Sequence, residues 1–175
     1  MHNNFPKNFY FINSYKKSNI IKLDNNTAVI YRNYREKLDL KQIIKIRNFC
    51  HNRKIKFFLS NNFKVALKLK CDGAYIPSFN KSFQHLSYKF RSRFILLGSA
   101  HNIKEIRIKE KQKVNLIFIS SLFKNNKNYL GIYKFLNMKK STKQKIIALG
   151  GISKLNIRRL KLLDCFGFSG ISYFE

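Results

Sequence analysis

The sequence predicts an α/β protein, a single compact (β/α)8 barrel of the triosephosphate isomerase (TIM) type with abbreviated helices. Three observations lead to it: apolar runs of strand length recur along the chain, stretches with helical spacing separate several of them, and the runs are almost continuously apolar. Such strands are typical of a parallel sheet covered on both faces, and eight of them close into a barrel. With 175 residues, 45% of them hydrophobic, we expect residues 1–175 to form one domain. An open doubly wound sheet is the alternative architecture.

The expected strands follow the apolar runs in chain order: FYFI (9–12), AVIY (28–31), IKFFL (55–59), AYI (74–76), FILL (94–97), LIFI (116–119), IIAL (146–149) and GFSGI (167–171). Apolar residues with a period of three to four predict helices between them, at residues 40–52, 63–70, 102–111, 130–138 and 154–163.

Several connections are too short or too irregular for a full helix. Residues 14–26 leave room for a short helix at most, and residues 77–93 show no helical stripe. The usual (β/α)8 barrel has about 250 residues, so abbreviation is expected. No eighth helix is expected after the last strand. Apolar barrel surface would then need cover from the N-terminal segment or from a neighbouring subunit in a homo-oligomer.

The chain is strongly basic, with 36 Lys and Arg against 8 Asp and Glu and a formal net charge of +28. Three interpretations stay open. A gene poor in G and C raises lysine everywhere and gives a solvated basic surface, which fits 7 Gly, 2 Pro and no Trp. Alternatively, the charge binds a polyanion such as nucleic acid, or steers a small anionic substrate. The lysines are spread from Lys7 to Lys161, so nucleic acid would bind only through a general basic surface.

Cysteine usage and hydropathy exclude several classes of protein. Cys50, Cys71 and Cys165 are odd in number and widely spaced, which fits neither a disulfide framework nor a zinc site. No apolar run has the length of a membrane helix, and the first residues lack the apolar stretch of a signal peptide. We expect a cytoplasmic protein without membrane contact.

Glycines concentrate near the last two predicted strands: Gly150, Gly151, Gly167 and Gly170 are four of the seven in the chain. Glycine lets backbone amides approach a ligand closely, and a phosphate is the natural ligand. Ser153 would cap a following helix whose first N–H groups favour an anion. The alternative interpretation is a pair of tight turns.

Five segments, in this order and spacing, resemble the thiamine-phosphate synthase and TenI-like thiazole tautomerase family: CDGAYIP (71–77), LGSAHN (97–102), ISSLF (119–123), ALGGI (148–152) with Asn156, and GFSGIS (167–172). Residues 29–34 and 57–62 resemble the second and third strands of that family, so the likeness runs from about residue 9 onward. The resemblance implies the barrel, a thiazole phosphate ligand and a place in thiamine biosynthesis.

Carried over by position, the resemblance assigns backbone contacts to the phosphate of thiazole phosphate. These contacts fall on Gly150, Gly151 and Gly170, with Ile171 and Ser172 beside them. It also places Arg32 at a strand end, where a guanidinium can bind diphosphate bidentately. A surface salt bridge is the alternative role for Arg32.

The departures from the family concern its chemistry. In the synthase, pyrimidine diphosphate loses diphosphate and the thiazole nitrogen attacks, with Mg²⁺ held by carboxylates. The two aspartate positions fall on Asn61 and Asn80, so Mg²⁺ is doubtful and no metal ligand is assigned. In the tautomerase a histidine transfers the proton, and Ser121 stands at its position. Serine cannot do this unaided.

His101 is the remaining candidate for proton transfer, although a hydrogen bond to loop backbone is the favoured role for it. Ser99 and Ser120 are expected to donate hydrogen bonds to a ligand. Asp72 starts a strand and is expected to be structural.

The residues favour an enzyme, a thiamine-phosphate synthase-like transferase, over a tautomerase-like isomerase. It would bind thiazole phosphate and condense it with hydroxymethylpyrimidine diphosphate. The alternatives are a catalytically degenerate protein that still binds thiazole phosphate, and a protein that binds nucleic acid or another polyanion.

Overall fold

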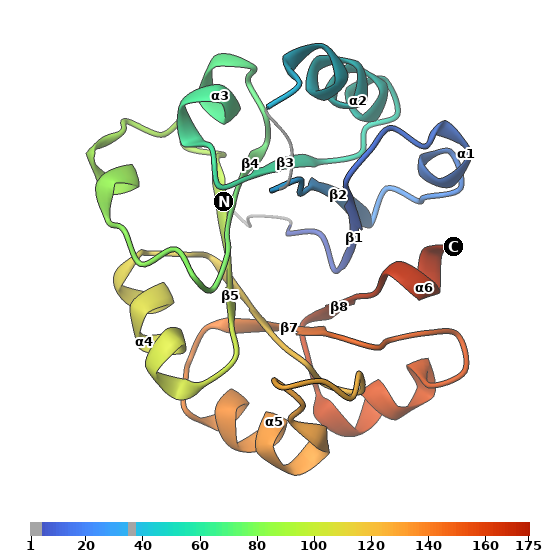
Figure 1. Ribbon diagram of the computed structural model, residues 1–175, viewed down its shortest axis with the longest axis vertical. Helices are drawn as coiled ribbons and strands as arrows, with labels where there is room; N and C mark the ends of the chain where they lie inside the picture. The colour runs from blue at the N-terminus through green and yellow to red at the C-terminus, as the bar shows by residue number, and fades with distance from the viewer. Residues whose placement is uncertain (1–4, 35–37) are drawn as a thin grey trace.

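A computed structural model describes residues 5–34 and 38–175. Its strands close into a parallel barrel in sequence order (Figure 1): β1 (Asn8–Ile12), β2 (Thr27–Tyr31), β3 (Phe57–Ser60), β4 (Gly73–Ile76), β5 (Ile95–Ala100), β6 (Leu116–Ile119), β7 (Lys145–Leu149) and β8 (Gly167–Ser169). The predicted (β/α)8 barrel is confirmed, because β8 pairs with β1 and leaves no open edge.

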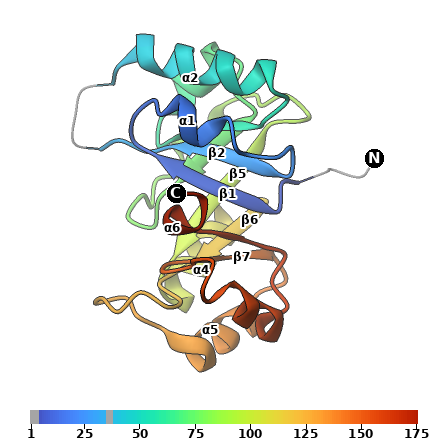
Figure 2. The same cartoon turned by 90° about the vertical axis from the view of Figure 1, so that its right-hand side faces the viewer.

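The connections between strands vary in length. The helices are α1 (Lys17–Ile20), α2 (Leu40–Asn52), α3 (Phe63–Lys68), α4 (Ile103–Lys111), α5 (Gly131–Lys140) and α6 (Ile171–Phe174), with 3-10 helices η1 (Gln84–Ser87) and η2 (Ile157–Leu163). Figure 2 shows α2 and α5 on opposite outer sides of the strands. Within the described ranges, no helix has the length and apolar character that crossing a membrane requires.

Aromatic rings fill the barrel interior. Alternate residues of each strand point inward, and five buried rings from β1, β3, β4 and β6 meet there: Phe9, Phe11, Phe58, Tyr75 and Phe118. The ring centroids of Phe9 and Phe118 are 4.8 Å apart, and those of Phe11 and Tyr75 are 5.2 Å apart, both pairs in edge-to-face geometry. These rings fill the barrel interior, so we expect a ligand at the carboxyl ends of the strands.

The region after β7 differs from the predicted helix. Residues 154–156 form a turn, and the helix that follows is a 3-10 helix that begins at Ile157 without a side-chain cap. The cause is Asn156, whose Oδ1 accepts a hydrogen bond from Ser153 N at 3.0 Å while its Nδ2 donates to Gly151 O at 2.8 Å. The expected helix capped by Ser153 is therefore wrong, and the argument for an anion at its first turn no longer applies.

The end of the barrel differs as well, because a short helix, α6, follows β8. The Phe174 ring on α6 packs against Tyr10 and Phe168, with centroids 5.4 and 6.1 Å apart. The chain itself thus covers the surface that was expected to need a neighbouring subunit. A homo-oligomer stays a prediction, but an uncovered apolar surface no longer supports it.

Candidate functional site

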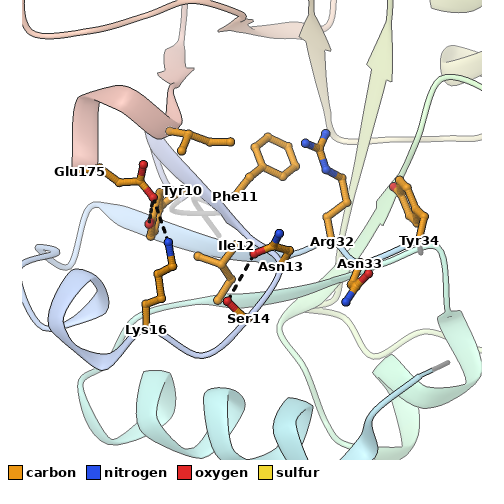
Figure 3. Close-up of a pocket in the computed structure, with 11 residues that line it drawn as sticks. Tyr10, Phe11, Ile12, Asn13, Ser14, Lys16, Arg32, Asn33, Tyr34 and Glu175 are labelled. Carbon is orange, nitrogen blue, oxygen red and sulfur yellow. Dashed lines mark hydrogen bonds and ion pairs between the residues drawn. The ribbon is translucent and has the colours of Figure 1, made fainter. Parts of the chain in front are cut away.

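A cleft with a volume of about 610 Å³ opens at the carboxyl ends of β1 and β2, beside α6 (Figure 3). Residues from three parts of the chain line it: Tyr10, Phe11, Ile12, Asn13, Ser14, Lys16, Arg32, Asn33, Tyr34, Ile171 and Glu175. Active sites of barrels of this kind lie at this end. The cleft is therefore the candidate site.

Arg32 provides positive charge on one wall of the cleft. Its backbone N–H donates to Ile12 O at 2.8 Å, which extends the pairing of β1 and β2 to the rim. Its guanidinium carbon lies 4.6 Å from the centroid of the Phe11 ring, over the aromatic interior (Figure 3). This cation–π contact holds the guanidinium above the barrel. Arg32 is thus placed as the sequence predicted, on a strand end, and its binding of diphosphate stays a prediction.

Two residues after Arg32, Tyr34 joins the rim to the β3 loop. Tyr34 Oη and Ser60 Oγ are 2.6 Å apart, and burial raises the pKa of Tyr34. The Tyr34 ring also meets the Phe79 ring edge-to-face, with centroids 5.3 Å apart. The contact between Tyr34 and Phe79 could not be predicted from the sequence, because no local pattern brings the loops after β2 and β4 together.

The glycines after β7 allow two loops to touch. Gly150 and Gly151 have φ angles of +104° and +74°, which side chains rarely adopt. A Cβ on Gly150 would lie 2.5 Å from Ser121 Oγ, and one on Gly151 would lie 2.5 Å from Lys124 N. These glycines are thus needed for the close approach of the loop between β6 and α5. That role is compatible with a ligand on their other side.

Gly170 brings the β8 loop against the β7 loop. A Cβ on Gly170 would lie 2.6 Å from Ile152 O. The next residues, Ile171 and Ser172, form the exposed first turn of α6, and Ile171 lines the cleft. The first N–H groups of a helix have no acceptor within it. The first turn of α6 therefore presents backbone N–H groups beside the cleft that contains Arg32, whereas Gly150, Gly151 and Gly170 do not line that cleft.

A family model with the description "Thiamine monophosphate synthase" matches residues 18–174 of the chain. The chain belongs to this family. The resemblance inferred from the sequence is thus confirmed, and so is thiamine biosynthesis as the setting of the family.

Curated relatives are named thiamine-phosphate synthase. The thiamine-phosphate synthase of Prochlorococcus marinus subsp. pastoris is 29% identical over 130 residues, which are 72% of this chain but 37% of that protein. The thiamine-phosphate synthase of Methanococcus vannielii is 26% identical over 144 residues, 80% of this chain and 67% of that protein. The chain thus spans well under half the length of the first of these relatives.

Solved structures support the fold. Thiamine phosphate pyrophosphorylase from Pyrococcus furiosus superposes with a TM-score of 0.79 at 19% identity, covering 97% of this chain and 87% of that one.

The positions where the family has metal-binding aspartates lie together. Asn80 Nδ2 donates to Asn61 Oδ1 at 2.6 Å, between the loops after β3 and β4. The two positions thus present neutral amides that are bonded to each other. A hard dication prefers anionic oxygen, and the described residues contain no group of three or more His, Cys, Asp or Glu that could hold a metal ion. These residues do not fit Mg²⁺.

His101 and the serines predicted as catalytic or ligand-binding are bonded within the chain. His101 Nδ1 lies 2.8 Å from Ser120 O and 3.1 Å from Ser120 Oγ, beside a groove between α4 and α5. Ser121 Oγ donates to Lys124 O at 3.0 Å. Ser99 hydrogen-bonds Tyr75, whose pKa is raised to about 12 by burial. This geometry favours the backbone-binding role for His101, and the functional roles of the serines stay predictions.

Proposed function

We propose that the chain is a transferase that binds thiazole phosphate and condenses it with hydroxymethylpyrimidine diphosphate. The observation that carries the proposal is the composition of one cleft: Arg32 from the end of β2 and Ile171 from the β8 loop line it together. One wall offers a guanidinium and the other offers backbone N–H groups. Two phosphorylated substrates can therefore meet between them.

The reaction needs these two anion sites because it joins two anionic molecules. The thiazole nitrogen forms a bond to the methylene carbon of the pyrimidine, and the bond between that carbon and the diphosphate oxygen breaks. Diphosphate leaves with the bonding electron pair. Arg32 would bind this leaving group bidentately, since its fork matches phosphoryl oxygens. The aromatic floor below would keep water from the reacting carbon.

A carboxylate placed beside the β8 loop tests the phosphate site. Ser172→Asp adds negative charge at an exposed residue, whereas Gly151→Asp would drive a side chain into the backbone at Lys124. Ser87→Asp, on an exposed residue of η1 that does not line the cleft, is the matched control for net charge. We expect calorimetry at physiological salt to give a dissociation constant for thiazole phosphate at least tenfold higher in Ser172→Asp, and unchanged in Ser87→Asp. Equal affinities in all three proteins would refute the assigned site.

Product formation tests the reaction. We expect thiamine phosphate and diphosphate in equal amounts from the two substrates, at a rate that a metal chelator does not change. Binding of thiazole phosphate without product would replace the transferase by the second candidate, a protein that kept the phosphate site and lost the chemistry. The neutral pair Asn61 and Asn80 is the observation that favours this second candidate.

The polyanion alternative predicts a different salt dependence. Exposed lysines stand on four helices, namely Lys41 on α2, Lys104 on α4, Lys134 on α5 and Lys161 on η2. Binding to such a dispersed surface should weaken steeply with salt. Thiazole phosphate bound by backbone N–H groups should weaken much less.

A further inference from the structure

A lysine without solvent exposure, Lys109 on α4, supports the loop between β4 and η1. Its Nζ donates to Pro77 O at 2.8 Å, to Asn80 O at 2.9 Å and to Gln112 Oε1 at 2.9 Å. All three acceptors are neutral. A buried cation without an anionic partner is rare in proteins, because burial favours the uncharged form.

The rest of the chain accommodates this lysine. Gly98 on β5 leaves space for its stem, since a Cβ there would lie 2.9 Å from Lys109 Cδ. Gln112, the residue that follows the end of α4, donates from Nε2 to Asn80 O at 3.1 Å and to Ser82 O at 2.8 Å. No buried side-chain N or O atom in the described ranges lacks a hydrogen bond. The two side chains therefore form a satisfied network that fastens the loop at both ends.

The fastened loop carries Phe79 and Asn80, which do not line the cleft themselves but contact residues of the neighbouring loops. Phe79 is 61% exposed yet is held against Tyr34, on the rim that also bears Arg32. Asn80 is bonded to Asn61 across the loop after β3. Lys109 itself touches neither the cleft nor these side chains.

We propose that Lys109 is a positioning residue: it fixes residues 77–82 so that Phe79 and Asn80 form the part of the mouth that receives the diphosphate substrate. This inference rests on the proposed function for the identity of that substrate. It predicts that the pyrimidine diphosphate site depends on Lys109, whereas the thiazole phosphate site at the β7 and β8 loops does not.

The first test measures the loop alone. Lys109→Met keeps the length of the stem and removes the three donors, and Lys111→Met on the exposed side of the same helix is the matched control. Amide hydrogen exchange is followed at Asn80 and Ser82, whose N–H groups donate within the loop to Pro77 O and Asn80 Oδ1. We expect at least tenfold faster exchange at these amides in Lys109→Met. Unchanged exchange would overturn the proposal, whatever the protein binds.

The second test measures both ligands on the same variants. We expect Lys109→Met to raise KM and the dissociation constant for pyrimidine diphosphate at least tenfold, with kcat and the affinity for thiazole phosphate within twofold of wild type. Loss of both affinities together with a lower melting temperature would indicate a merely structural role and overturn the proposal. A wild-type protein that binds neither ligand would instead refute the proposed function, and with it the role of the loop in that site. Faster exchange with unchanged affinity for pyrimidine diphosphate would overturn the role of the loop alone.

Discussion

Lys109 should make the stability of the protein rise with pH over an unusual range. Burial lowers the pKa of Lys109 from 10.5 to about 8, and nearby Glu105 offsets this only in part. Between these two pH values the unfolded chain holds a proton on this lysine that the folded chain has released. Stability must then increase with pH across that window. Each pH unit changes the free energy of unfolding by about 1.4 kcal/mol, so this free energy should increase by roughly 2–3 kcal/mol across the window. The lower value allows for solvent screening at the loop.

The assay is urea unfolding of wild type and Lys109→Met from pH 7 to 10.5. Other groups titrate in this range, among them cysteines and tyrosines whose raised pKa values act in the opposite direction, but both proteins share them. The difference between the two unfolding free energies isolates Lys109. We expect the unfolding free energy of the wild type, relative to that of the variant, to increase by roughly 2–3 kcal/mol as pH rises from 8 to 10.5. A constant difference across this window would refute the lowered pKa of Lys109.

Three further predictions concern other sites. Gly151→Ala should destabilise the fold by roughly 3 kcal/mol in urea unfolding, since its Cβ would lie 2.5 Å from a backbone nitrogen at φ +74°. Gly131→Ala, at φ +63° with its nearest contact at 3.4 Å, should cost only about 1 kcal/mol, and an equal cost would contradict the steric argument. Burial raises the pKa of Cys50 to about 12, so an aromatic disulfide reagent at pH 8 should modify it no faster than the protein unfolds. The double variant Asn61→Asp, Asn80→Asp should acquire a melting temperature that rises with Mg²⁺, which wild type should lack.

Most of the strands could be predicted because they are buried on two sides. Inward residues meet the aromatic interior and outward residues meet the helices, so the runs at β6 and β7 are apolar without interruption. Helical spacing predicts α2, whose buried Ile43, Ile46 and Cys50 recur every three or four residues. The positions of Asn61 and Asn80 came from the family resemblance, since no local pattern brings the two loops together.

The features that could not be predicted from the sequence each depend on a single side chain. The turn at residues 154–156 follows from two hydrogen bonds of Asn156 that no propensity encodes. Lys109 stands three residues after the buried Ile106, yet lysine at that spacing is normally solvent-exposed. Gly98 inside an apolar strand was the available signal, because a missing side chain in such a strand marks close approach by another group.

The ring of Phe118 has a consequence for how the chain folds. It lies on β6 and contacts Phe9 and Phe11 on β1 and Tyr75 on β4, with centroids 4.8, 6.0 and 5.6 Å away. A fragment that ends after β4 would leave these three rings without the partner that packs among them. Neither half of this barrel therefore holds a finished interior of its own, and folding should be a single cooperative transition in which the first and sixth strands order together.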